Sequence, residues 1–477
     1  MDLSQVIRQK IFQIISLSAQ EIEQDCYVIG GYVRDFLLGK TLSKDIDIVT
    51  TGEGILLAKQ VAKNIFPSPK VSLFKRFGTA MLKYEGQEIE FVGSRKESYR
   101  SNSRKPIVET GTLEDDQNRR DFTINTLAIS LNQEDYGRLI DPFNGQEDLK
   151  RKIIRTPLDP EVTYSDDPLR MFRAIRFATQ LRFTIETASL QCIRNNKQRI
   201  HIVSMERIMD EFQKIFLAQK PSIGLQLLYK TELLTIILPE LTVLQGIEEK
   251  EGQTHKDNFY HTLEVVDNIS RETDSIWLRW AALLHDIGKS PTKKYLPKTG
   301  WTFHSHEFVG AKMIPYIFRR LKLPMGSSMK YVQKIVRYSS RPIALVGDEA
   351  TDSAVRRLLF DAGDDLEDLM TLCKADITTK NPIKQRRYKK NFSLVIEKIK
   401  ELEEKDRIRN WQPPISGTDI MDAFGLGPCK QIGIIKSSLK EAILEGEIPN
   451  EYDSAFAFML KKGKELGLQK KKNQIFL

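Results

Sequence analysis

Residues 26–48 read CYVIGGYVRDFLLGKTLSKDIDI, and this stretch sets the strand and helix pattern of the N-terminal region. A short apolar run ends in Gly30 and Gly31, a pair that lets the backbone approach a phosphate closely. In DIDI, alternation at period two places Asp45 and Asp47 on one face of a strand. Two neighbouring carboxylates repel each other, so they indicate either a divalent metal site suited to phosphoryl transfer or an exposed acidic turn.

A third acid often completes such a metal site from a neighbouring strand. Glu90 in the segment QEIEFVG at 87–93 is the best-placed candidate, but Glu88 lies on the same strand face, so the choice between them stays open. Further strands are predicted at CYVIGG, TAMLKY and INTLAIS, and helices at VRDFLLG and GILLAKQVAKNIF. The polar stretch at 94–118 has no apolar period and predicts a long loop.

Length and composition limit the class of protein. A chain of 477 residues is long enough for three or four domains. Its 73 Lys and Arg against 64 Asp and Glu give a net charge of +9, which favours either a polyanionic partner such as nucleic acid or a basic surface that keeps the protein soluble. The four cysteines show no CxxC spacing, and no apolar run reaches the ~18 residues of a membrane span. We therefore expect a cytoplasmic protein without a membrane partner.

Residues 165–177 read SDDPLRMFRAIRF and predict the start of a helix. Asp167 precedes a proline, as an N-cap residue does before the first helical position. Arg170, Arg173 and Arg176 then recur every three residues and form a basic ridge on that helix. Asp167 is therefore either a structural cap or, together with the ridge, part of a site for an anionic ligand.

Several motifs resemble those of one family. GGYVRDFLLG followed by DIDI resembles the head of class II tRNA nucleotidyltransferases and bacterial poly(A) polymerases. The later stretches NRRDFTINTLA, DPFNGQEDLKRKIIRT, YSDDPLRMFRAIRFA and SMERIMDEFQKI agree with the family's motifs in the same order. The resemblance covers about residues 25–220 and implies a polymerase-β-like head, a small mixed sheet with helices.

The resemblance also implies roles for individual residues. Asp45 and Asp47 would be catalytic and bind Mg²⁺, while Asp167 and Arg170 would pair with the base edge of CTP or ATP. The implied nucleotide-binding residues are Gly30, Gly31, Arg34, Asp35, Arg120, Asp121, Asn125, Asp167, Arg170, Arg173 and Arg176. The alternative for the RRDFTIN residues is a salt bridge at a strand end. One departure is Asp166, which stands where the family usually has Glu.

A second set of polar residues begins at HTLEVVDNI and LRWAALLHDIGKS. The adjacent His285 and Asp286 end an apolar helix, where burial needs compensation by a metal ion or by hydrogen bonds. His261 and Asp376 are the other candidate ligands, and the set suits Mn, Fe, Ni, Zn or Mg. The pattern resembles the HD domain, a metal-dependent phosphohydrolase module, and His306 matches a further histidine of that superfamily.

The remaining features fill out this interpretation. VRYSSRP at 336–342 replaces a histidine pair found in many HD domains, which argues against a two-metal site. His201, His255 and His304 are expected to be structural. Basic runs at KQRRYKK (384–390) and in the tail up to Lys472 indicate either contacts that neutralise phosphates without base readout or a solvated basic face.

Together the motifs predict an α+β fold with a head, an all-α neck, an HD domain and a C-terminal helical arm. We place the nucleotidyltransferase head at 1–150, the neck at 151–250, the HD domain at 251–385 and the RNA-binding arm with its basic tail at 386–477. The predicted function is a CCA-adding enzyme that acts on tRNA with CTP and ATP, as a monomer or homodimer. A divalent metal of unidentified type is expected at the HD site. The alternatives are a poly(A) polymerase, an A-adding enzyme, or an HD phosphohydrolase acting on RNA ends.

Overall fold

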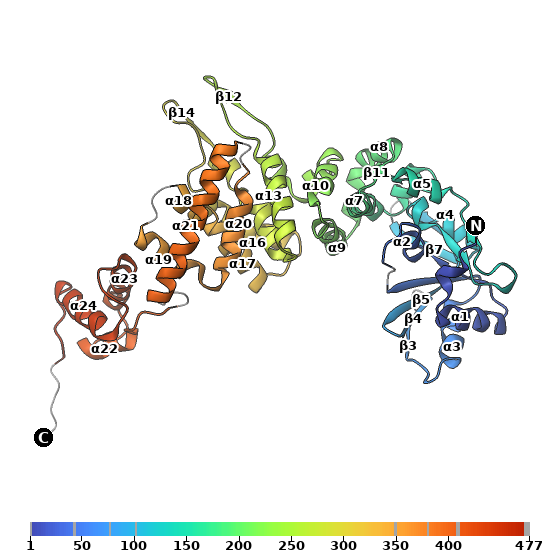
Figure 1. Ribbon diagram of the computed structural model, residues 1–477, viewed down its shortest axis with the longest axis horizontal. Helices are drawn as coiled ribbons and strands as arrows, with labels where there is room; N and C mark the ends of the chain where they lie inside the picture. Colours follow the sequence, from blue (N-terminus) through green and yellow to red (C-terminus); the bar gives the residue numbers. More distant parts are fainter. Residues whose placement is uncertain are drawn as a thin grey trace. The chain divides into compact units, whose positions relative to one another are not determined.

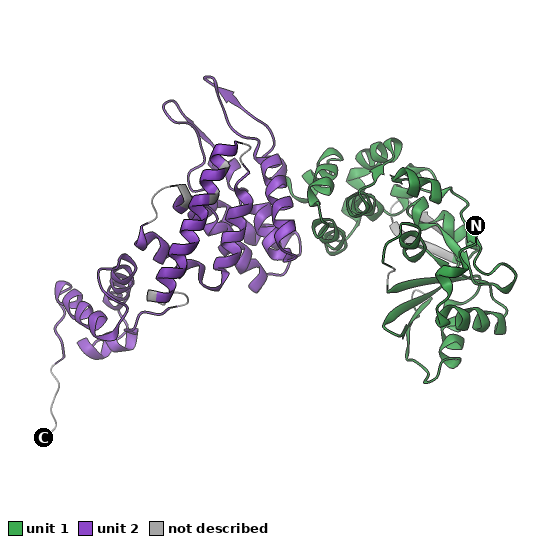
Figure 2. Cartoon of the chain, viewed as in Figure 1, with its two compact units in different colours: residues 1–239 green, residues 240–477 purple. Residues whose placement is uncertain are grey.

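The chain divides into two compact units, Met1–Pro239 and Glu240–Leu477 (Figure 2). The computed structural model describes residues 2–41, 44–75, 78–100, 103–347, 351–378, 381–406 and 411–471. Lys472, at the end of the predicted basic tail, lies outside these residues. Within the described ranges, no helix combines the length and the apolar character that crossing a bilayer requires. The predicted division into four domains stays a prediction.

A mixed sheet organises the first unit (Figure 1). In the described residues it has seven strands in the order β3-β4-β5-β2-β1-β8-β9. The strands are β1 (Cys26–Ile29), β2 (Asp45–Thr50), β3 (Val71–Phe74), β4 (Thr79–Tyr84), β5 (Gln87–Gly93), β8 (Ala128–Ser130) and β9 (Leu139–Ile140). Strands β2 and β5 are parallel, and the other neighbours are antiparallel. The strand that carries DIDI is therefore central, and the predicted strands are confirmed.

Helices α1 (Lys10–Glu21), α2 (Gly31–Leu37) and α3 (Gly54–Lys63) accompany the sheet. Helix α3 contacts β4 and β5 and also packs against α1. Its Leu57 and Val61 are fully buried, because apolar residues at helical spacing form one face. This face covers the sheet and fixes the strands on which the acidic residues stand.

The prediction of a loop at 94–118 was wrong. Strands β6 (Arg95–Arg100) and β7 (Ser103–Thr110) pair antiparallel, and helix α4 (Leu113–Asn118) follows them. A two-stranded ribbon is held by backbone hydrogen bonds, so its side chains need not alternate between apolar and polar. Thr112 caps α4 by accepting a hydrogen bond from the Asp115 backbone N–H. The helix places acidic residues beside the RRDFTIN motif.

The rest of the first unit is mainly helical. Helix α7 (Leu169–Leu181) packs against α9 (Met205–Phe216) and α10 (Pro221–Lys230), and its Met171, Ile175 and Ala178 are fully buried as their spacing predicts. The other elements here are α5 (Gly145–Arg151), β10 (Ile153–Ile154), α6 (Pro160–Asp166), β11 (Thr184–Ile185), α8 (Thr187–Asn196) and α11 (Leu233–Ile237). Helix α12 (Pro239–Thr242) begins at the last residue of this unit and continues into the second.

In its described residues, the second unit is helical apart from two short hairpins. Helix α13 (Asn258–Glu272) packs against α14 (Ile276–Leu284) and α20 (Leu366–Asp376). The hairpins are β12 (Glu249–Lys250) with β13 (Gln253–Thr254), and β14 (Lys294–Leu296) with β15 (Gly300–Thr302). The other helices are α15 (Lys289–Thr292), α16 (His306–Arg320), α17 (Ser327–Tyr338), α18 (Ser340–Gly347), α19 (Asp352–Ala362), α21 (Pro382–Asp406), α22 (Gly417–Phe424), α23 (Lys430–Glu445) and α24 (Tyr452–Glu465).

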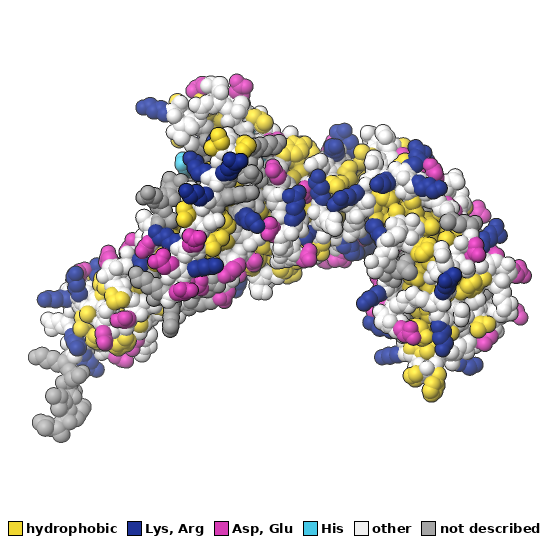
Figure 3. Space-filling view, in the orientation of Figure 1, with side chains coloured by type: hydrophobic (Ala, Val, Ile, Leu, Met, Phe, Trp, Pro, Cys, Tyr) yellow, Lys and Arg dark blue, Asp and Glu magenta, His cyan; other side chains and the backbone are white. Residues whose placement is uncertain are grey.

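The last three helices share a small apolar core. Ile420 of α22, Leu439 of α23 and Met459 of α24 are buried together. Basic and acidic side chains are interspersed over the viewed face of this second unit (Figure 3). The net positive charge of the sequence is therefore not gathered into one patch on that face.

Candidate functional site

Asp45 and Asp47 lie on the same face of β2, as the alternation predicts. Asp45 is exposed and Asp47 is half-buried, whereas Ile46 and Ile48 are buried. Burial raises the pKa of Asp47, and Asp45 adds to this, while Arg120 opposes it. The pair therefore lies in a site where an additional cation would be stabilised.

The strand register distinguishes the two candidate third acids. Glu90 lies opposite Asp47, and Glu88 lies opposite Asp45. Glu88 makes an ion pair with Lys83 at 2.5 Å. Desolvation and the nearby Asp47 charge raise the pKa of Glu90. Glu90 is therefore the acid that the sheet brings beside Asp47.

The glycine turn lies directly beside these carboxylates. Gly30 has a φ of +83°, a conformation that residues with a Cβ rarely adopt. A Cβ at this position would lie 3.2 Å from Arg120 Nη1 and 3.4 Å from Asp47 Oδ2. Gly31 begins α2, two residues earlier than the predicted helix. The turn is therefore required both by backbone conformation and by close approach of the site residues.

A chain of hydrogen bonds joins the predicted nucleotide-binding residues. Arg34 Nη1 donates to Asn125 Oδ1 at 2.8 Å, and Asn125 Nδ2 donates to Asp121 Oδ1 at 2.9 Å. Arg173 Nε donates to Asp121 Oδ2 at 2.7 Å. Arg34 also pairs with Asp35 at 2.9 Å. The RRDFTIN segment thus links the helix after the glycine turn to α7.

The Asp121 carboxylate makes its hydrogen bonds to neighbouring residues of the protein. Burial alone would raise the pKa of Asp121, but Arg173 and Asn125 outweigh it and hold the pKa below its usual value. Its Oδ1 also accepts from the Phe122 backbone N–H at 2.9 Å. Both of its oxygens therefore have partners, which agrees with the salt-bridge alternative for this residue and gives it an orienting role.

A cavity of about 370 Å³ lies between the RRDFTIN segment, α7 and α9. Its lining includes Asp167, Arg170 and Arg173 on one side and Arg207 and Lys214 on α9. Asp167 Oδ1 accepts from the Leu169 N–H at 3.2 Å, so it does cap the helix as predicted. Capping engages one oxygen, and the carboxylate still lines the cavity.

The last arginine of the ridge has a structural partner. Arg176 Nε lies 2.6 Å from Glu211 Oε2 of α9, and both side chains are largely buried. Its guanidinium also lies 4.1 Å from the centre of the Phe177 ring, a cation–π contact. The guanidiniums of Arg34 and Arg173 approach the same ring at 5.1 and 5.5 Å. Arg176 therefore fixes α7 against α9.

Asp116 of α4 is a site residue that was not predicted. It is fully buried and pairs with both arginines of the RRDFTIN motif, Arg119 and Arg120. The spacing of three and four residues along LEDDQNRR is the feature that could have indicated it. Because Asp115 also lies four residues before Arg119, the sequence did not single out Asp116.

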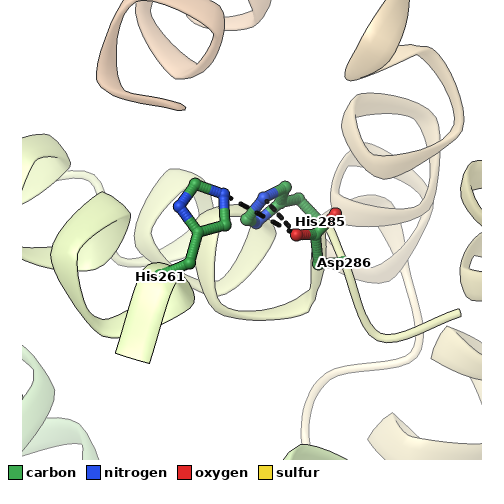
Figure 4. A group of neighbouring side chains, drawn as sticks. All are labelled: His261, His285 and Asp286. Carbon is green, nitrogen blue, oxygen red and sulfur yellow. Dashed lines mark ion pairs between the residues drawn. The ribbon is translucent and has the colours of Figure 1, made fainter. Parts of the chain in front are cut away.

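The second predicted cluster also comes together. His261, His285 and Asp286 point toward one another from α13 and the end of α14 (Figure 4). In the part of the chain that the structure describes, they are the one group of three or more such residues close enough to hold a metal ion. Asp376 Oδ1, at the end of α20, lies 2.7 Å from His261 Nε2 and 3.6 Å from His285 Nε2.

His285 shows how this donor set fits a divalent cation. Its Nδ1 lies 2.8 Å from the Ala282 carbonyl oxygen, to which it donates, so Nε2 is the ring nitrogen that faces the carboxylates. This buried Nε2 has no hydrogen-bond partner among the described residues. Burial alone would lower the pKa of His285, but Asp286 and Asp376 raise it to about 10. The two carboxylates therefore favour a positive charge at Nε2, and a bound divalent cation would take the place of the proton there. Two carboxylates and two imidazoles around one point suit a divalent metal.

His306 completes the edge of this cluster. Its Nε2 lies 3.4 Å from Asp286 Oδ1, while its Nδ1 lies 2.9 Å from the Phe303 carbonyl oxygen. Lys289 Nζ pairs with Asp286 Oδ2 at 2.7 Å. Of the histidines expected to be structural, His255 packs edge-on against the Trp301 ring, 5.4 Å between ring centres. His201 and His304 are exposed.

Three family models match the chain. The Poly A polymerase head domain matches residues 26–155. The model described as "Probable RNA and SrmB- binding site of polymerase A" matches residues 182–244. The HD domain matches residues 258–379. The first model includes Asp45 and Asp47, and the third includes the cluster of His261, His285 and Asp286.

Curated proteins with related sequences cover much of the chain. An A-adding tRNA nucleotidyltransferase from Deinococcus radiodurans is 35% identical over 70% of this chain and 76% of its own length. A multifunctional CCA protein from Shewanella frigidimarina is 30% identical over 76% of this chain and 86% of its own. A CCA-adding enzyme from Lactobacillus helveticus is 37% identical over 44% of this chain and 50% of its own.

Solved structures share the fold. The complex of a CCA-adding enzyme with ATP aligns over 97% of this chain and 98% of its own, with a TM-score of 0.64 and 20% identity. A tRNA-processing enzyme in an apo form aligns over 83% of this chain and 97% of its own, with a TM-score of 0.59 and 26% identity. The polymerase-β-like head with its mixed sheet, followed by helical parts and an HD domain, is thus confirmed.

Proposed function

Because the chain belongs to the tRNA nucleotidyltransferase family and is a nucleotidyltransferase, we propose that it adds CMP, CMP and AMP in turn to the 3′ end of tRNA. The observation that carries this proposal is the cavity lined by Asp167 and Arg170, in the same unit as Asp45 and Asp47. CTP and ATP are the proposed substrates and tRNA the acceptor. Whether the chain acts as a monomer or a homodimer stays a prediction.

Base selection rests on the side chains of the cavity. The exocyclic amine of cytosine or adenine donates to the Asp167 carboxylate, and the Arg170 guanidinium donates to a ring or carbonyl acceptor. Arg170 is held in place, since its Nη2 donates to the Arg119 carbonyl oxygen at 2.5 Å. Uracil and guanine present the wrong donor and acceptor pattern. The protein thereby supplies the selection that a nucleic-acid template supplies in other polymerases.

The acidic face of β2 carries the residues that we propose for catalysis of nucleotidyl transfer. Asp45 and Asp47, with Glu90 beside them, would hold Mg²⁺, which when bound favours ionisation of the 3′-hydroxyl and neutralises the pyrophosphate. The tRNA 3′-oxygen forms a bond to the α-phosphorus, and the bond from that phosphorus to the pyrophosphate oxygen breaks. Arg120, next to Asp47, offers positive charge to the phosphates. Because tRNA is the proposed acceptor, we propose that the protein acts in the cytoplasm.

A second candidate function is A addition alone. The relative from Deinococcus radiodurans, similar over most of its length, carries the name A-adding tRNA nucleotidyltransferase. The residues of the cavity serve cytosine and adenine equally, because both bases present an amine next to a ring acceptor. The two functions therefore differ in whether CTP is used.

Both candidates are tested by one assay. Purified protein is given Mg²⁺, CTP and ATP with tRNA transcripts that end before the CCA, after one C or after two, and the 3′ ends are sequenced. CCA addition predicts that all three transcripts grow to CCA and stop. Growth of only the CC end, by one A, would establish A addition, and long A tails would establish a poly(A) polymerase.

We further propose that the HD centre hydrolyses phosphate esters at RNA ends. His261, His285, Asp286 and Asp376 would hold a divalent ion, with His306 at the edge, and such an ion when bound generates a hydroxide from water. Lys289, which pairs with Asp286, supplies positive charge for a phosphate.

The assay uses an RNA oligonucleotide with a 3′-phosphate and follows release of inorganic phosphate. Asp286→Asn should abolish release while nucleotide incorporation continues, and Asp47→Asn should have the opposite effect. Release that persists in Asp286→Asn would contradict the proposed hydrolase.

A further inference from the structure

Asp116 is connected, through Arg119 and Arg120, both to the acidic strand β2 and to helix α7, which carries Arg170. It is fully buried on α4, and its two oxygens face two different arginines. Arg119 Nε donates to Asp116 Oδ1 at 2.9 Å, and Arg120 Nε donates to Asp116 Oδ2 at 3.0 Å. Both arginines line the cavity of about 370 Å³. One buried carboxylate therefore sets the position of two cavity-lining side chains.

Through Arg120, Asp116 reaches the acidic strand and the glycine turn. Arg120 Nη1 donates to the Asn125 carbonyl oxygen at 3.4 Å and lies against Gly30, where a Cβ would be only 3.2 Å away. The charge of Arg120 also stabilises the ionised form of Asp47. Asp116 accepts from Nε of this guanidinium and the Asn125 carbonyl oxygen accepts from its Nη1. Two partners on different nitrogens therefore fix the orientation in which its charge faces Asp47.

Through Arg119, Asp116 reaches the base-selecting helix. The Arg119 carbonyl oxygen accepts the hydrogen bond from Arg170 Nη2. The side chain of the same residue is fixed by Asp116, which lies three residues earlier in α4. A shift of this backbone would therefore move the Arg170 guanidinium.

We propose that Asp116 is a positioning residue for nucleotidyl transfer, which holds Arg119 and Arg120 so that phosphate contacts and base selection keep one geometry. An unrestrained arginine must lose side-chain conformational freedom when it binds a ligand. A buried carboxylate that accepts from the guanidinium imposes this order before the nucleotide arrives. The proposal rests on the proposed transfer function, because it concerns the same cavity.

The charge state of Asp116 agrees with this role. Burial alone would raise the pKa of Asp116, but Arg120 and Arg119 outweigh burial and hold the pKa below its usual value. The carboxylate therefore stays ionised, and the group of three side chains keeps one net positive charge for an anionic ligand.

The test is a double-mutant cycle with Asp116→Asn and Arg120→Gln. Asp116→Asn keeps the shape of the side chain and removes its charge. If it acts through its arginines, kcat/KM for the nucleotide should fall about 10- to 100-fold while the KM for tRNA is unchanged. In the Arg120→Gln background the same substitution should cost much less, because one pairing is already lost. An equal fold loss in both backgrounds, or no loss in either, would overturn the inference.

Two controls accompany the cycle. Glu114→Gln, an exposed acid on the same helix, should leave kcat/KM and stability unchanged. If Asp116→Asn does not fold, Arg119→Lys and Arg120→Lys keep both charges but lose the guanidinium fork, and wild-type activity in both would overturn the inference.

ATP affinity measured by calorimetry gives a readout that does not need turnover. A weaker affinity in Asp116→Asn supports the positioning role even where the acceptor differs from tRNA. Failure of the wild type to extend tRNA would instead contradict the transfer function alone.

Discussion

Asp47 and Glu90 lie directly opposite each other in the parallel strands β2 and β5. This pairing supports Glu90 over the alternative that the sequence left open, because Glu88 lies opposite Asp45 and pairs with Lys83. We expect Glu90→Gln to lower nucleotide incorporation and to raise the Mg²⁺ concentration needed for half-maximal rate. Glu88→Gln is the matched control and should change neither. Equal effects of the two variants would contradict the assignment of Glu90.

Asp47→Asn should abolish incorporation without unfolding the head. Loss of a ligand removes several kcal/mol of charge stabilisation in the transition state, which corresponds to a rate loss of about a thousandfold. The measurement is single-turnover addition of radiolabelled CMP or AMP. Thermal unfolding checks the fold, and residual activity within tenfold of wild type would contradict a catalytic role.

Asp167→Ala should reduce discrimination among the four nucleotides. A bidentate contact to a base contributes about 1 to 3 kcal/mol of discrimination, so the preference for CTP and ATP over UTP and GTP should fall roughly 10- to 100-fold. The same substitution removes a helix cap and should cost about 1 kcal/mol of unfolding free energy. A loss of stability with unchanged nucleotide preference would leave Asp167 as a cap alone.

Gly30→Ala should damage both stability and activity. A Cβ at Gly30 adds backbone strain of about 1 to 3 kcal/mol and also crowds Arg120 and Asp47. Gly39 is the matched control, because its φ is also positive, at +65°, but nothing lies within 4 Å of its Cβ position. Gly39→Ala should therefore lose some stability in chemical denaturation but keep its incorporation rate. Equal activity losses would contradict the close-approach argument.

Glu211→Gln should destabilise the first unit. Glu211 pairs with Arg176 at 2.6 Å, both side chains are largely buried, and removal of one partner from such a pair costs about 3 to 5 kcal/mol. Urea unfolding measures the change. Glu206→Gln, an exposed acid on the same helix, should stay within about 0.5 kcal/mol of wild type.

His285→Ala should remove metal from the HD centre. Its buried Nε2 faces Asp286 and Asp376, which favour a positive charge between them, and a bound metal ion would take the place of the proton on Nε2. Metal analysis of the purified protein should show less bound divalent metal in the variant than in wild type. Prolonged chelation of the wild type should have the same result, and it should lower the unfolding temperature because a bound metal stabilises the folded state. Unchanged metal content in the variant would contradict the assignment.

Short-range patterns of residue types determined several strands and helices and the positions of both candidate sites. Alternation in DIDI determined that Asp45 and Asp47 share a face, because successive side chains of a strand point in opposite directions. The adjacent His285 and Asp286 at the end of an apolar helix predicted the second centre, because two buried polar residues there need a metal ion or hydrogen bonds. Periodicity failed at 94–118, where the β6–β7 ribbon is held by backbone groups that leave no pattern in the side chains.

Only the tertiary structure decided which distant residues meet. The parallel pairing of β2 with β5 selected Glu90 over Glu88, and the packing of α20 on α13 brought Asp376 to His261. Burial selected Asp116 from a run of three acids as the partner of two arginines. Strand register and burial depend on contacts between segments far apart in the chain, and no local pattern of residue types records them.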